Sequence, residues 1–294
     1  MNILVPLIRR VNIPAAFFIA ALLASWACWF ASSYLVKPTL FFQAGAGNHW
    51  FEISIQTLLL VLGSSIPGIA TLFFPRSIKA RTRFARFLWL LNPVRAKSRY
   101  YAVAILCPIA ISFLAASLNL FTGGANVLLP KASGWVAAVL LNLPLSPLWE
   151  ELGWRGFVTS ELQKFYSGFR ASLIGGILWG FWHAPLKLFL RHDSPIAQPI
   201  YLFLLFCIFS TGLAVILSWL FNRTSGALLP VVLFHSIHNT TSTYLIDPAV
   251  LKDGLSPVLW ASVMVWTFAA AVRIQAGRDL GLARTNNTQT APMG

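Results

Sequence analysis

The sequence has few charged residues, and very few of these are acidic. Lys, Arg, Asp and Glu make up 10% of its 294 residues, and Asp and Glu together number 8. A soluble domain is ~25% charged. The low charge therefore excludes a soluble globular enzyme, a disordered tail protein and a nucleic-acid-binding domain, so no nucleic acid is expected among the partners.

Cysteine is also scarce. Cys28, Cys107 and Cys207 each lie inside an apolar run, and their spacing matches neither a set of metal ligands nor a disulfide framework. We expect them to be small core residues.

Long apolar runs are abundant. The residue types A, V, I, L, M, F, W, Y and C form 57% of the chain, which suits seven or eight membrane-spanning helices of about 20 residues each. We predict an all-α, polytopic integral membrane protein with about eight transmembrane helices. The predicted spans are 14–36, 53–74, 100–121, 134–154, 170–190, 199–221, 226–244 and 256–274.

The organisation of the chain is simple. No internal repeat is visible, and the first apolar run is too long for a cleaved signal peptide, so we expect a retained signal-anchor. Residues 1–274 are predicted to form one transmembrane helical domain, with the motifs described below in 149–239. Residues 275–294 are polar and are predicted to be a disordered cytoplasmic tail.

The distribution of Lys and Arg tests the number of spans. With a cytoplasmic N-terminus, sixteen basic residues fall on the cytoplasmic side and five on the other. The five are Lys37, Lys131, Lys187, Arg191 and Lys252. This asymmetry follows the positive-inside rule and requires an even number of spans, with both termini in the cytoplasm.

The loop 76–99 carries eight of the sixteen cytoplasmic charges. Its middle, residues 84–91, combines Arg86 with bulky apolar residues, which predicts an interfacial amphipathic helix on anionic lipid. The alternative is that these charges only determine topology.

Ionisable groups at membrane depth are costly and indicate function. A first cluster lies at the end of the fourth predicted span, in Trp149-Glu-Glu-Leu-Gly-Trp-Arg155. Glu151 and Arg155 are four residues apart on a helix and can form an ion pair. Glu150 then points elsewhere, without a local partner. A carboxylate partly buried among apolar groups can take and return a proton near neutral pH.

Two further clusters lie in later spans. His183 follows Trp179 by one helical turn and precedes Pro185, which weakens the helix. His235 and Asn239 share one face of the seventh span, and such a pair can polarise a carbonyl and stabilise an oxyanion. Taken singly, His183 could equally be a buried packing residue. His235 and Asn239 could equally form interhelical hydrogen bonds that only hold the helices together.

Together, Glu150, His183, His235 and Asn239 supply what hydrolysis of an amide by water requires. Other routes fit less well. The His-Glu-x-x-His helix of common zinc proteases is absent, no aspartate lies in a predicted span, and no Gly-x-Ser-x-Gly elbow occurs. The same residues leave a metal open, because Glu150, His183 and His235 could bind zinc with one position free for water.

These motifs resemble those of the CPBP family, the CAAX-protease and bacteriocin-processing proteins. The matching elements are Glu150-Glu151-x-x-x-Arg155, an aromatic residue (Trp179, where the family pattern usually has Phe) four residues before His183, and His235-x-x-x-Asn239. The resemblance implies an intramembrane endopeptidase of glutamate or metallo type.

The resemblance also implies roles for the matching residues. Glu150 and His183 would activate water, and His235 and Asn239 would stabilise the oxyanion. The substrate would be a peptide or protein, lipidated in eukaryotic members, which lose three residues from prenylated C-termini. The resemblance favours a bacterial inner membrane. Two other readings stay open: a non-catalytic immunity or scaffold factor, and a proton-coupled transporter, for which the repeats typical of transporters are not visible.

Overall fold

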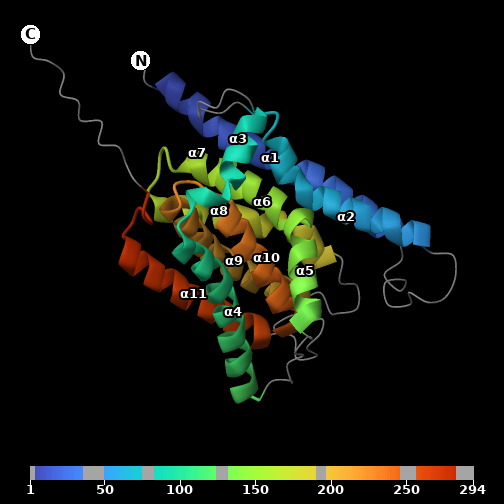
Figure 1. Ribbon diagram of the computed structural model, residues 1–294. Coiled ribbons are helices and arrows are strands. Elements are labelled where there is room, and N and C mark those ends of the chain that lie inside the picture. Colours follow the sequence, from blue (N-terminus) through green and yellow to red (C-terminus); the bar gives the residue numbers. More distant parts are fainter. Residues whose placement is uncertain are drawn as a thin grey trace, which may run out of the picture.

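The computed structural model describes residues 4–35, 50–74, 83–123, 132–189, 197–245 and 256–282, and its regular elements there are all helical (Figure 1). The elements are α1 (Leu4–Leu35), α2 (Trp50–Ala70), α3 (Arg83–Leu91), η2 (Pro93–Arg95), α4 (Ser98–Phe121), α5 (Ala132–Leu145), α6 (Pro147–Gly153), η3 (Trp154–Thr159), α7 (Ser160–Leu162), α8 (Gly168–Trp182), η4 (Pro185–Phe189), α9 (Ala197–Arg223), α10 (Leu229–Leu245) and α11 (Ser256–Ala276). The prediction of an all-α protein is confirmed.

Several of these helices are long and apolar enough to cross a membrane. In the described part of the chain the full-length candidates are Ile13–Tyr34, Ser98–Phe121, Ile200–Arg223 and Pro257–Ala276, with shorter apolar helices at Ile55–Ala70 and Ser133–Leu145. The count of eight spans, with both termini in the cytoplasm, stays a prediction.

Helices α9 and α10 carry much of the core. Leu213, Val215 and Leu217 of α9 and Val231 and Phe234 of α10 are almost completely buried. Helix α9 packs against α8 and α11, α10 packs against α4 and α5, and α1 lies beside α2 (Figure 1). The motif residues His235 and Asn239 therefore lie on one of the most buried helices, α10.

The fourth predicted span is not one straight helix. The break comes at Ser146, directly before Pro147, because a residue before proline avoids the helical region, whereas Pro144 lies inside α5. Ser146 has φ −136° and ψ −59°, and Pro147 opens α6. Helical backbone then continues through the π-helix η3 to Leu162, since Trp154, Phe157 and Val158 are all buried. The helical backbone thus continues past the predicted end of the span at 154, and Glu150 lies in the first turn of a second helical segment.

The close approach of α2 to α6 depends on two glycines. A Cβ at Gly68 would lie 2.7 Å from the carbonyl oxygen of Trp149, and one at Gly153 would lie 2.7 Å from the carbonyl carbon of Pro67. The backbones of the two helices therefore touch directly beside Glu150.

Replacing Gly68 with alanine is expected to lower the free energy of unfolding by about 1–3 kcal/mol, because the added methyl overpacks this contact. Thermal unfolding of the protein in detergent measures the effect. Gly134→Ala is the matched control, since a Cβ there meets no atom within 4 Å and alanine favours the helix by up to ~1 kcal/mol. Equal stability of the two variants would contradict the contact.

The helix predicted within the basic loop is present as α3, while residues 75–82 lie outside the described part. Leu90 is buried and its carbonyl accepts a hydrogen bond from the Leu228 amide at 2.8 Å. The Arg95 guanidinium lies 3.2 Å from the centroid of the Trp89 ring and donates to the Ser225 carbonyl at 2.5 Å. Burial lowers the pKa of Arg95. Contact of this helix with lipid stays a prediction.

The predicted tail overlaps the structure in part. Helix α11 ends at Ala276, Leu280 is buried, and the Phe169 amide donates to the Arg278 carbonyl at 2.9 Å. Residues 283–294 lie outside the described part. Any tail therefore begins after these packed residues.

Candidate active site

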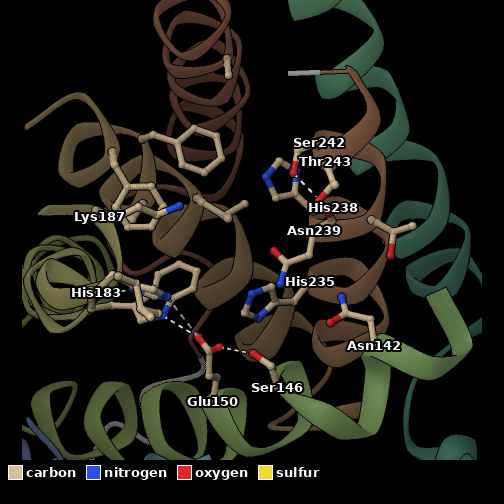
Figure 2. A pocket seen from close by; sticks show the side chains of 18 of the residues that line it. Asn142, Ser146, Glu150, His183, Lys187, His235, His238, Asn239, Ser242 and Thr243 are labelled. Carbon is tan, nitrogen blue, oxygen red and sulfur yellow. Dashed lines mark hydrogen bonds and ion pairs between the residues drawn. The ribbon is translucent and has the colours of Figure 1, made fainter. Parts of the chain in front are cut away.

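The three motifs line one cavity of about 640 Å³. Side chains reach it from the α5–α6 segment, from α8 and η4, and from α9 and α10 (Figure 2). The cavity wall includes Glu150, Trp179, His183, His235 and Asn239. Segments almost a hundred residues apart in the sequence thus meet at one cavity.

Glu150 is 3% exposed and its carboxylate is held on both sides. The Ser146 hydroxyl donates to Oε1, and the Trp179 indole donates to Oε2 at 2.9 Å. The expectation that Glu150 lacks a local partner is wrong, because Ser146 lies one turn before it. Trp179 therefore binds the Glu150 carboxylate directly. The phenylalanine that is usual at this position in the family pattern could not donate this hydrogen bond.

His183 faces Glu150 from the end of α8. Its Nδ1 lies 2.9 Å from the carbonyl oxygen of Trp179. Because a carbonyl can only accept, Nδ1 carries the proton and Nε2 is left toward the cavity. His183 Nε2 lies 4.0 Å from Glu150 Oε2, which is too far for a direct hydrogen bond but allows a bridging water.

The backbone around His183 is held by α1. The Trp26 indole donates to the carbonyl of Trp182 at 2.9 Å, and the Trp182 ring packs at 4.6 Å from the imidazole. Pro185 then opens the π-helical turn η4, in agreement with the weakening predicted from its position.

Glu151 has a different role from Glu150. It is fully buried, and its Oε1 accepts from Arg155 Nη1 at 3.1 Å and from His235 Nδ1 at 2.8 Å. The Arg155 guanidinium also lies 4.5 Å from the centre of the Trp179 ring. The predicted ion pair is therefore present, and Glu151 additionally orients the histidine of the third motif.

His235 and Asn239 form the wall opposite His183. With Nδ1 bonded to Glu151, His235 has only Nε2 left for the cavity, and Nε2 donates there when both ring nitrogens carry protons. Asn239 is partly exposed to the cavity one turn later, with its amide directed toward His235 (Figure 2). His238 lies beside them, stacked on Phe209 with ring centroids 5.3 Å apart.

Among the polar residues of the cavity wall that the sequence analysis did not single out are Asn142, Ser146 and Lys187. Ser146 lies four residues before Glu150, so the four-residue helix spacing that paired Glu151 with Arg155 also predicts this contact. Asn142, whose amide nitrogen lies 3.4 Å from the Ser236 carbonyl, gave no signal. Lys187 was assigned to topology alone, although it lines the cavity (Figure 2).

The hypothetical zinc site of Glu150, His183 and His235 does not fit the geometry. Within the described ranges, no group of three or more His, Cys, Asp or Glu side chains is arranged to hold a metal ion. Both oxygens of Glu150 already accept protein hydrogen bonds, from Ser146 and Trp179. No step below is therefore assigned to a metal.

The comparisons with known proteins agree with the motifs. Residues 132–241 match the family model of the type II CAAX prenyl endopeptidase Rce1-like proteins. The chain is also 25% identical over 267 residues to CAAX prenyl protease 2 of Methanococcus maripaludis, an alignment that covers 86% of this chain and 93% of the relative. The matched region contains every motif residue that lines the cavity. These findings, together with the apolar helices, support an integral membrane protease of the CPBP family.

Proposed function

We propose that the protein is an intramembrane endopeptidase that hydrolyses a peptide bond of a membrane-associated, lipidated peptide or protein. The observation that carries this proposal is the position of the buried Glu150 carboxylate, 4.0 Å from His183 Nε2. Both groups line the cavity that His235 and Asn239 also line. A base, a second proton-handling group and two donors therefore converge on one space.

The reaction begins with a water bound between Glu150 and His183. Glu150 takes a proton from this water, and the resulting hydroxide attacks the scissile carbonyl carbon. The carbonyl oxygen becomes an oxyanion that accepts hydrogen bonds from the Asn239 amide and from His235 Nε2. Glu150 then returns its proton to the nitrogen of the leaving amine as the C–N bond breaks.

The membrane arrangement belongs to the same proposal. Eight spans with both termini in the cytoplasm, in one domain over 1–274 and in a bacterial plasma membrane, would bring the cavity to a substrate anchored by its lipid. Helix α3, with Leu88 and Trp89 exposed, would lie on the anionic leaflet and place the basic loop 76–99 at its surface.

A direct test uses the purified full chain in lipid nanodiscs. The substrate is a farnesylated peptide ending in Cys-a-a-X, where a is an aliphatic residue and X is the last residue. The comparison peptide has the same sequence without the lipid. We expect release of a tripeptide from the lipidated peptide, detected by mass spectrometry. Recovery of both peptides intact would reject the proposed activity.

Ser146→Ala should lower the turnover number about tenfold to a hundredfold, because a hydrogen bond to a charged group is lost at the proposed base. The Ser146 side chain makes no capping bond to α6, so loss of a helix cap would not explain the effect. Ser146→Thr retains a hydroxyl and should retain most of the rate.

The matched control is Ser210→Ala. Ser210 lines the same cavity, but its hydroxyl donates to the Cys207 carbonyl of its own helix. Cleavage kinetics of the lipidated peptide provide the measurement. Equal rates for Ser146→Ala and Ser210→Ala would remove Ser146 from the positioning of Glu150.

A further inference from the structure

The cavity holds a third histidine that the proposed chemistry does not use. His238 lines the cavity together with His183 and His235. His183 Nδ1 lies 2.9 Å from the Trp179 carbonyl oxygen, and His235 Nδ1 lies 2.8 Å from a carboxylate oxygen of Glu151. Nδ1 of His238 is also buried, but it has no hydrogen-bond partner among the described residues. The folded chain therefore leaves part of the hydrogen-bonding capacity of this imidazole unused.

The His238 side chain is packed in a defined position beside the proposed oxyanion site. The residue is 2% exposed, and its ring stacks on Phe209 with the centroids 5.3 Å apart and 27° between the planes. On α10 it follows His235 by three residues and directly precedes Asn239. In Figure 2 it lies beyond these two residues as seen from Glu150. The unpartnered nitrogen thus belongs to a fixed part of the cavity wall.

Aromatic rings connect His238 with His183 along one wall of the cavity. The Phe206 centroid lies 5.1 Å from the His183 ring and 6.3 Å from the Phe209 centroid. Phe209 in turn stacks on His238, and all four residues line the cavity. A peptide bound along this wall would therefore place one peptide group at His238 while another lies near His183.

An unpartnered imidazole in this position is unfavourable for the protein without a ligand. A buried polar group that makes no hydrogen bond costs the free energy of its desolvation. Polar residues of membrane helices ordinarily hydrogen-bond to a neighbouring helix, and within the described helices Nδ1 of His238 makes no such bond. A neutral imidazole offers one donor and one acceptor, which match the carbonyl and the N–H of a peptide group. A peptide that enters the cavity would remove the cost.

We propose that His238 is a substrate-binding residue that hydrogen-bonds a backbone peptide group next to the scissile bond. The inference rests on the proposed function and adds a contact that holds the substrate without touching the reacting atoms. Residues of an extended chain are about 3.3 Å apart, and His238 is the sequence neighbour of Asn239. A peptide whose scissile carbonyl lies at Asn239 therefore brings an adjacent peptide group to the His238 ring.

The first test changes the residue. His238→Phe keeps a ring that can stack on Phe209 but has no polar atom. It should raise KM for the farnesylated peptide about fivefold to a hundredfold, with a smaller change in kcat. The melting temperature of the protein without substrate should stay the same or rise, because the substitution removes an unpartnered buried nitrogen. A lowered melting temperature with an unchanged KM would assign His238 to the fold and overturn the inference.

Conservative variants separate hydrogen bonding from ring packing. Asparagine carries its amide near the position of Nδ1 and glutamine near that of Nε2, so one of His238→Asn and His238→Gln should retain much of the wild-type KM. If neither improved on His238→Phe, packing would explain the effect and the inference would fail. Ser210→Ala is the matched control and should keep the wild-type KM, because Ser210 lines the same cavity but donates to the Cys207 carbonyl.

The second test changes the substrate and leaves the wild-type chain intact. In each of two farnesylated peptides an ester oxygen replaces one peptide N–H, either in the bond before the farnesylated cysteine or in the bond after the scissile one. For the wild type, one of the two esters should raise KM by a similar factor. For His238→Phe, that ester and the parent peptide should have similar KM values. An ester penalty of equal size in both chains would overturn the inference.

Binding distinguishes this inference from the proposed activity. Fluorescence anisotropy measures the Kd of a labelled farnesylated peptide for Glu150→Gln and for the double variant that also carries His238→Phe. A Kd raised by a similar factor in the double variant supports the contact. If the wild type then left the peptide intact, only the proposed activity would fail. Cleavage by the wild type together with equal Kd values would retain the activity and overturn the role of His238.

Discussion

Replacing Glu150 with glutamine is expected to lower the cleavage rate roughly 10²–10⁴-fold, to near background, while the fold stays intact. General acid–base catalysis contributes effects of this size. The glutamine amide fills the volume of the carboxylate and can still interact with Ser146 and Trp179, but it cannot take a proton from water. Turnover of the farnesylated peptide, together with the thermal unfolding temperature in detergent, separates lost chemistry from lost structure.

Glu161→Gln is the matched control for this substitution. Glu161 is also a glutamate on the α6–α7 path, but its carboxylate pairs with Lys164 and does not line the cavity. This variant should cleave the peptide at close to the wild-type rate. If Glu150→Gln did the same, Glu150 would not be the base, and a scaffold or immunity factor that only binds a partner would explain the site better.

The sequence predicted those features of the site that are encoded locally. Apolar runs identified helices, and four-residue spacing correctly placed Glu151 against Arg155 with Glu150 on another face. The same spacing relates His183 to Trp179, whose carbonyl holds the imidazole. These relations depend only on helix geometry, which a single sequence displays.

The remaining features depend on contacts between helices. The bond from Trp179 to Glu150 joins residues 29 positions apart, and the bond from His235 to Glu151 joins residues 84 positions apart. Which faces meet is decided by packing, including the backbone contact that Gly68 allows between α2 and α6. The break at Ser146 had a local signal in its two flanking prolines, but hydropathy alone read the segment as one span.

Glu151→Gln should be the most destabilising of the site substitutions, at about 3–5 kcal/mol, because it removes one partner of a buried ion pair. Arg155 is 1% exposed, so its charge would stay buried without the carboxylate that neutralises it. His235 would also lose the group that orients its ring. Thermal unfolding in detergent should therefore show a large shift, accompanied by reduced cleavage.

Two comparisons test this explanation. Glu161→Gln removes a partly exposed ion pair and should change stability by less than about 1 kcal/mol. The double variant Glu151→Gln with Arg155→Met removes the unpaired buried charge and should regain part of the lost stability. It should not regain activity, because His235 still lacks its carboxylate partner.

The two glutamates are therefore separable by experiment. Loss of Glu150 should lower the cleavage rate and leave the free energy of unfolding unchanged. Loss of Glu151 should lower the free energy of unfolding, and the cleavage rate should fall as a consequence. A Glu151→Gln variant that is fully stable but inactive would reverse the assignment, since the proton would then have to be handled by Glu151. In that case Glu150, which Ser146 and Trp179 hold by hydrogen bonds, would be a positioning residue rather than the base.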